Sequence, residues 1–82
     1  MASVRADIFR RLRSLLAESL GAEEEEITLD TNVYDDLNAD VIEFHDEVIP
    51  LIEQEFGLTI EDEDVDQLTT VRELVDYLVE NI

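Results

Sequence analysis

The chain has 82 residues, which is enough for one domain with one small core, because a domain of this size buries only about 60–65% of its unfolded surface. Its hydrophobic content of 45% is too high for a disordered chain, and its two glycines and one proline are too few for an all-β fold. The formal net charge of −18 excludes nucleic acid as a partner, and the absence of cysteine excludes disulfides, thiolate metal sites and thiol catalysis.

A first amphipathic helix is predicted between Ser3, which can cap its start, and Gly21, which is a suitable left-handed terminator. Arg5, Arg10, Arg11 and Arg13 lie in this region, so four of the five basic residues of the chain fall within its first 13 positions. The apolar face is formed by Val4, Ile8, Leu12, Leu15 and Leu16, whose spacing is helical.

Residues 22–39 form a long connection, which begins with the charge run Glu23 to Glu26. A connection of this length is uncommon in a compact domain unless it is packed or functional. Apolar residues that could pin it across a pair of helices are Ile27, Leu29, Val33, Tyr34 and Leu37.

A second helix is predicted over residues 41–56, ending at Gly57. Asp40 is a natural N-cap, and Glu43 three residues later forms a capping-box-like pair with it. The buried stripe of this helix is predicted to contain Ile42, Val48, Ile49, Ile52 and Phe56.

The remaining chain predicts one short helix and one long helix. Val65 and Leu68 are three residues apart, which is enough for a short helix laid on the core. Thr70 and Glu73 form a capping box at the start of the last helix. Its buried stripe is predicted to contain Val71, Leu74, Val75, Leu78 and Ile82.

The stretch Asp36-Leu37-Asn38-Ala39-Asp40-Val41-Ile42-Glu43 closely resembles the signature of the acyl carrier proteins, which reads Asp-Leu-Gly-Ala-Asp-Ser-Leu. The order of landmarks from Phe56 to Tyr77 also follows that family, so the resemblance covers nearly the whole chain. It implies one domain over residues 1–82, an all-α bundle of three main helices plus one short helix, with a long loop between the first and second helices. The residues themselves give little support for catalysis: no Ser-His-Asp arrangement is suggested, there is no glycine-rich phosphate loop, and paired carboxylates carry no information in so acidic a chain. We therefore expect a protein that is not an enzyme.

Val41 stands where the resemblance places the serine that carries the 4'-phosphopantetheine arm, so no cofactor is expected on the chain as written. Attachment needs a hydroxyl that can attack the pyrophosphate of coenzyme A, and residues 32–56 contain no Ser, Thr, Cys or Lys. Asn38 replaces the glycine of the signature, and asparagine tolerates the left-handed conformation better than most residues.

Two functions remain open, together with a weaker third. The chain is either a relative that has lost its arm and acts as an acidic docking or scaffold module for lipid- or polyketide-type enzymes, or a genuine acyl carrier protein of fatty-acid or specialised lipid biosynthesis in which Val41 is a substitution. A mimic of nucleic acid is the third, and it rests on net charge alone.

By resemblance, the residues that bind partner enzymes through their basic surfaces are Asp40, Glu43, Asp46, Glu47 and Glu53. The alternative for any one of them is a solvated helix face, since an exposed ion pair contributes only about 0–1 kcal/mol. We expect no insertion into a membrane, because no apolar run approaches the ~20 residues that a membrane span requires. A cytoplasmic location is the default expectation, and we expect a monomer.

Pro50 lies inside the second helix, where it removes a backbone donor and clashes with the carbonyl of Asp46. The span from Asp40 to Phe56 also has one residue more than the typical family pattern. Together these features predict a bulge or kink near residues 46–50.

Metal sites have little support in the sequence. His45 lies beside the apolar stripe, so a packed or boundary histidine is favoured over a ligand paired with Asp46 or Glu47. A calcium loop is suggested only by spacing, and Gln67 stands where such a loop needs glycine. The acids at ligand spacing are Asp62, Asp64, Asp66 and Glu73.

Overall fold

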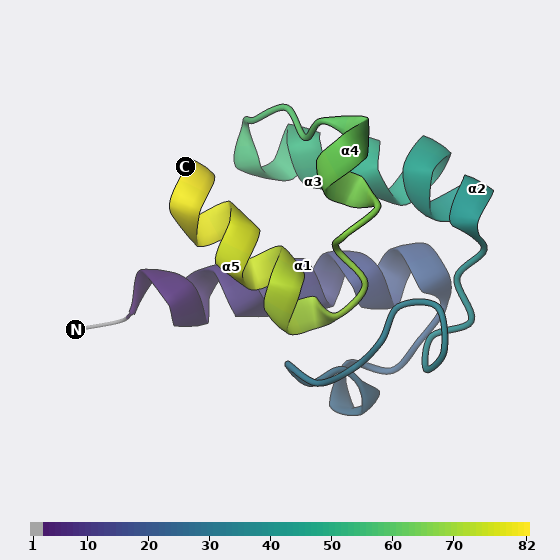
Figure 1. Ribbon diagram of the computed structural model, residues 1–82. Helices are drawn as coiled ribbons and strands as arrows, with labels where there is room; N and C mark the ends of the chain where they lie inside the picture. The colour runs from purple at the N-terminus through teal and green to yellow at the C-terminus, as the bar shows by residue number, and fades with distance from the viewer. Residues whose placement is uncertain (1–2) are drawn as a thin grey trace.

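A computed structural model describes residues 3–82 of the chain, which form an all-α bundle (Figure 1). The elements in order are α1 (Val4–Leu20), the 3₁₀ turn η1 (Glu24–Glu26), α2 (Val41–Glu43), the π-helical turn η2 (Phe44–Val48), α3 (Ile49–Phe56), α4 (Asp62–Val65) and α5 (Val71–Asn81). Because α2, η2 and α3 follow one another without a break, they make one long second helix. The predicted architecture of three main helices, one short helix and a long first loop is confirmed.

The core lies where α1 packs against both α5 and α3. The start of α1 and the end of α5 lie at the same end of the bundle, and α2 begins at the opposite end (Figure 1). Arg5 of α1 and Asp76 of α5 form an ion pair that joins the two helices. Side chains that are almost completely buried include Ile8, Leu12, Leu16, Phe44, Ile52, Leu74 and Leu78.

Each predicted helix boundary coincides with a cap. The Ser3 hydroxyl accepts a hydrogen bond from the Ala6 amide at 3.4 Å, and Gly21 ends α1 with a φ of 66°. Gly57 ends α3 in the same left-handed conformation, with a φ of 68°. At the start of α5, Thr70 and Glu73 form the predicted capping box.

The long loop between α1 and α2 is packed across the start of α5. The Val33 amide donates to the Thr69 carbonyl at 2.9 Å, and the Val71 amide donates to the Thr31 carbonyl at 3.0 Å. All five predicted anchors pack on the core: Ile27, Val33 and Leu37 are buried, and Leu29 and Tyr34 are partly buried against it. The loop therefore has a fixed conformation up to the residues that begin α2.

The predicted bulge in the second helix is confirmed and is the π turn η2. The Ile49 amide donates to the Phe44 carbonyl, five residues back rather than four, so this turn holds one additional residue. Pro50 is the second residue of α3, directly beyond the π turn, and it cannot donate the N–H that an uninterrupted α-helix would direct to the Asp46 carbonyl.

Two of the apolar positions expected in the buried stripes are exposed at the ends of helices. Val4 is 65% exposed in the first turn of α1, and Ile82, beyond the end of α5, is 57% exposed. The prediction of burial was wrong at both positions because the helical spacing continues past the point where a neighbouring helix covers the face.

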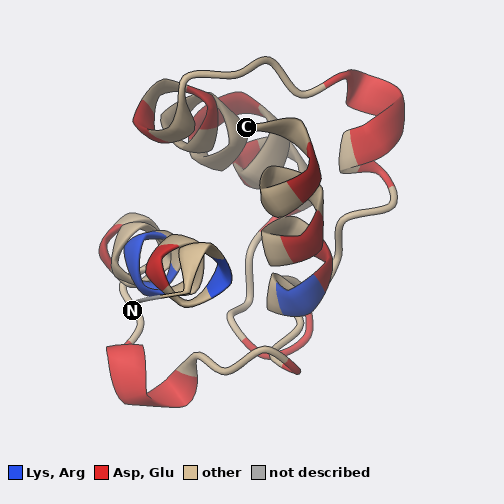
Figure 2. Cartoon of the chain, turned by 90° about the vertical axis from the view of Figure 1, so that its left-hand side faces the viewer, with Lys and Arg blue, Asp and Glu red and all other residues tan. Residues whose placement is uncertain are grey.

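Basic residues are confined to α1 and to the start of α5, whereas acidic residues occur on every helix and in the loops (Figure 2). Over residues 3–82, no helix combines the length and the apolar character that crossing a membrane requires.

Replacing Thr70 by Ala should lower the free energy of unfolding by about 1 kcal/mol, because the Thr70 hydroxyl accepts the Glu73 amide at the start of α5. Urea denaturation measures this change. Thr59→Ala is the control, since Thr59 is exposed and its hydroxyl has no bond within the described chain; equal losses for the two variants would contradict the capping role.

The contribution of Glu73 should depend on pH. Hydrogen bonds from the Thr70 amide first, and from Thr69, lower the pKa of this carboxyl below its ordinary value. The stabilisation is therefore complete above the pKa of the unfolded chain and is lost as the pH falls through the lower pKa of the folded state. Urea titrations of the unchanged chain and of Glu73→Gln should differ at neutral pH and converge in acid; a difference that is constant with pH would contradict this assignment.

Candidate functional site

The turn that leads into α2 is held by the packed loop. The Asn32 amide donates to the Asp36 carboxylate at 2.8 Å, and the Ala39 amide donates to the Val33 carbonyl at 3.0 Å. Asn38 lies between these contacts and has the left-handed conformation, with a φ of 58°. The acyl carrier signature has glycine at this position, and asparagine is one of the few other residues that adopt this conformation. The turn therefore keeps its shape with asparagine, as the sequence predicts.

Val41 is the first residue of α2 and is 59% exposed. Asp40 caps the helix, as predicted, by accepting the Ile42 amide at 2.7 Å. Within residues 3–82, no bond runs from the Glu43 side chain to the Asp40 amide, so this start has the cap but not the reciprocal half of a capping box. Residue 41 is thus exposed on the capped first turn of α2, and α2 lies at the end of the bundle opposite the start of α1 and the end of α5 (Figure 1).

Ile42 lies outside the core, and Phe44 takes the buried place at this end of the second helix. Ile42 is 70% exposed, whereas Phe44 is fully buried with its ring edge-on to Tyr34 at 5.5 Å between centroids. The prediction of a buried Ile42 was therefore wrong. The regular spacing of Phe44, Val48 and Ile52, each four residues apart, carried the correct signal.

Four of the five acids predicted to bind partners surround one shallow hollow of about 450 Å³. Asp40, Glu43, Asp46 and Glu47 line it together with Ile42. Glu53 does not join them. Its carboxylate accepts the Ile60 amide at 2.7 Å and so fixes the loop that follows α3.

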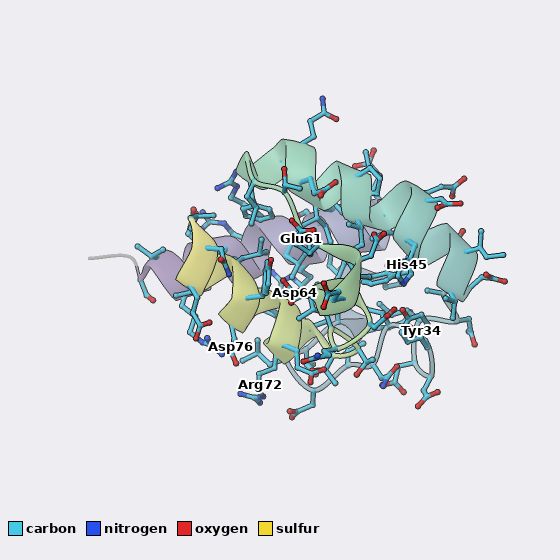
Figure 3. The ribbon with its side chains drawn as sticks, turned by 45° about the horizontal axis from the view of Figure 1, so that its top comes forward. Tyr34, His45, Glu61, Asp64, Arg72 and Asp76 are labelled. Carbon is cyan, nitrogen blue, oxygen red and sulfur yellow. The ribbon has the colours of Figure 1, made fainter. Side chains whose placement is uncertain are left out.

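His45 is a boundary residue, as the sequence predicts. Its side chain is 22% exposed, and its Nε2 lies 3.4 Å from the Asp66 carboxylate, so it bridges the π turn to the segment after α4. Figure 3 shows His45 and Tyr34 on the same side of the molecule. Tyr34 lies nearby, and its pKa is raised mainly by burial and further by the charge of Asp66. The phenol therefore keeps its proton and is a poor nucleophile.

The described residues contain no group of three or more side chains that could hold a metal ion. The acids at calcium-loop spacing are used otherwise. Asp62 and Asp64 lie in α4, where Asp64 accepts the Tyr77 hydroxyl at 3.0 Å, and Glu73 caps α5.

Comparison with known proteins decides the family. The family model described as "Phosphopantetheine attachment site" matches residues 10–78, which is most of the chain. The chain belongs to this family. Members are carrier proteins rather than enzymes, so the expectation that this protein is not an enzyme is also confirmed.

Relatives of this carrier-family chain agree in length as well as in sequence. This chain is 37% identical over 76 residues to the acyl carrier protein of Petrotoga mobilis, and the match covers 93% of this chain and 88% of that protein. It is 38% identical over 77 residues to the acyl carrier protein of Rubrobacter xylanophilus, covering 94% of each. The solved acyl carrier protein of Enterococcus faecalis superimposes with a TM-score of 0.81 at 34% identity, covering 98% of this chain and all of that one.

Because Phe44 is buried and Ile42 is exposed, we expect truncation of the two side chains to lower the free energy of unfolding by unequal amounts. Phe44→Ala should lower the free energy of unfolding by about 3–5 kcal/mol, because it removes a fully buried ring. Ile42→Ala should change it by less than about 0.5 kcal/mol, because that side chain is mostly in solvent. Chemical denaturation of both variants measures the costs, and a larger loss at Ile42 would contradict this packing.

Proposed function

We propose that this chain is a carrier-family protein without an arm, which docks on partner enzymes but carries no acyl group. The observation that supports this proposal most strongly is Val41. An exposed valine at the capped start of α2 occupies the position that the signature assigns to the attachment serine. Two methyl groups offer no oxygen with which to attack the pyrophosphate of coenzyme A.

No neighbouring group replaces that missing hydroxyl. Tyr34 is the only hydroxyl-bearing residue between positions 32 and 56, and burial raises its pKa. His45 lies on the π turn with its ring toward Asp66, not at the start of α2. The proposal therefore has no covalent step, and 4'-phosphopantetheine would be carried only if residue 41 were a serine.

Docking would use the acidic surface beside Val41. The net charge of −18 attracts basic protein surfaces and disfavours association of two copies, which supports a monomer that binds acyl-processing enzymes. Lipid- or polyketide-type biosynthetic enzymes are the expected partners, and we infer a cytoplasmic setting for them, as the sequence predicts.

The second candidate is a genuine acyl carrier protein in which Val41 is a substitution of the attachment serine. The relatives favour it, since those named acyl carrier protein match about nine-tenths of this chain at 35–38% identity. Val41 favours the first candidate, because the chemistry of attachment starts at that side chain.

A gain-of-function experiment tests the proposal. We expect the unchanged chain, incubated with coenzyme A and a broad-specificity phosphopantetheinyl transferase, to keep its mass, whereas Val41→Ser gains one phosphopantetheine group. Serine is well tolerated at the start of a helix, so the variant should fold. Intact-mass spectrometry provides the measurement, and Val41→Ala, which is small but lacks a hydroxyl, is the matched control.

Two results would count against the proposal. Modification of the unchanged chain between residues 32 and 56 would show that an attachment site exists after all. A folded Val41→Ser variant that takes no arm from several transferases would show that residue 41 is not the attachment position.

A further inference from the structure

Through the middle of the chain, only one side chain can carry a positive charge. Between Arg13 and Arg72 there is no lysine or arginine, and the single histidine, His45, lies in that stretch. Figure 2 accordingly shows the basic residues on α1 and at the start of α5. The second helix and the α4 segment, residues 61–66, are therefore both acidic, and among their side chains only that of His45 can become positive.

His45 lies where these two acidic elements meet. Its Nε2 is 3.4 Å from Oδ1 of Asp66, the residue at which α4 ends. Its ring packs edge-on to the buried ring of Phe44, with 6.4 Å between the centroids. The imidazole is therefore a largely buried group with a defined partner, rather than a freely moving surface side chain.

Two other polar contacts hold the α4 segment, and neither involves a histidine. Asp64 accepts the Tyr77 hydroxyl of α5 at 3.0 Å, and the Ile60 amide, just before the segment, donates to the Glu53 carboxylate at 2.7 Å. Histidine is the side chain whose charge ordinarily changes between about pH 5 and pH 8. Of these three contacts, only the one between His45 and Asp66 should therefore respond to pH near neutrality.

The other titratable groups near the imidazole do not take over this response. Tyr34 of the long loop lies close enough to Asp66 for its charge to act, but burial first and this charge second raise the pKa of the phenol, which stays neutral. Asp46 and Glu47, the neighbours of His45 on the π turn, line the hollow that contains Ile42. Asp66 is therefore the charged group in direct contact with His45.

We propose that His45 and Asp66 form a pH-sensitive link between the second helix and the α4 segment. When the imidazole is protonated, its charge attracts Asp66 and offsets the repulsion between the two acidic elements. When it is neutral, the attraction is lost and the repulsion loosens the α4 segment. The stabilisation is thus present at the acid end of the range and is lost as the pH rises. This inference is independent of the docking function proposed above, because both groups act within the chain.

Urea denaturation of the full chain at about pH 5.5 and about pH 8, on either side of the ordinary titration of imidazole, tests the link. Asp66→Asn removes the charge that contacts His45. Glu63→Gln is the matched control, because it removes one negative charge from α4 at an exposed side chain with no bond within residues 3–82. His45→Gln, alone and combined with Asp66→Asn, completes a double-mutant cycle.

Relative to the unchanged chain, Asp66→Asn should raise the equilibrium constant of unfolding about two- to five-fold more at the lower pH than at the higher pH. The effect of Glu63→Gln should be nearly the same at both. In chains that carry His45→Gln, the pH dependence of the Asp66→Asn effect should disappear.

An Asp66→Asn effect of the same size at both pH values would overturn the link, because the contact would then not depend on the charge of the imidazole. An equal pH dependence for Glu63→Gln would also overturn it, because His45 would then respond to the overall negative charge and not to Asp66. If His45→Gln does not fold, the comparison of Asp66→Asn with Glu63→Gln still decides the question, since both replace exposed residues.

Discussion

The packing of Phe44, Val48 and Ile52 against the core is the constraint on which the rest of the structure depends. The second helix contains a surplus residue and an interior proline, either of which would rotate or break a continuous α-helix. The π turn absorbs the surplus residue, and Pro50 lies directly beyond it as the second residue of α3, where the helical pattern of hydrogen bonds is already interrupted. All three apolar side chains consequently remain buried on one side of the helix.

The outer surface of the helix follows from that inner packing. Once Phe44 fills the core, Ile42 and Val41 remain in solvent at the capped start of α2. After the turn, Glu53 meets the backbone of the loop that leads to α4, so its charge serves the fold rather than the surface. The acidic surface proposed for docking is thus separated from the part of the helix that supports the fold, because of where the core is anchored.

Local chemistry explains how much the sequence could predict. Ser3, Gly21, Gly57 and Thr70 determine helix ends through their own backbone or side-chain bonds, so these boundaries are readable without tertiary information. The span from Asp40 to Phe56 has one residue more than the typical family pattern, and this surplus likewise predicts a bulge. Burial at helix ends depends on which neighbour covers them, as at Val4 and Ile82, and the role of Glu53 depends on a loop amide seven residues away. The spacing of apolar residues along one helix predicts neither the exposure of helix ends nor a hydrogen bond to a distant loop.

The central claim is that a carrier-family fold is used here without the carrier's arm. It is tested most directly by the intact mass of this protein purified from its native host, compared with the mass of the chain as written. The account predicts a chain whose residues 32–56 carry no adduct and in which position 41 is valine. A phosphopantetheine adduct on the second helix, or a serine at position 41 of the native protein, would contradict it and identify an ordinary acyl carrier.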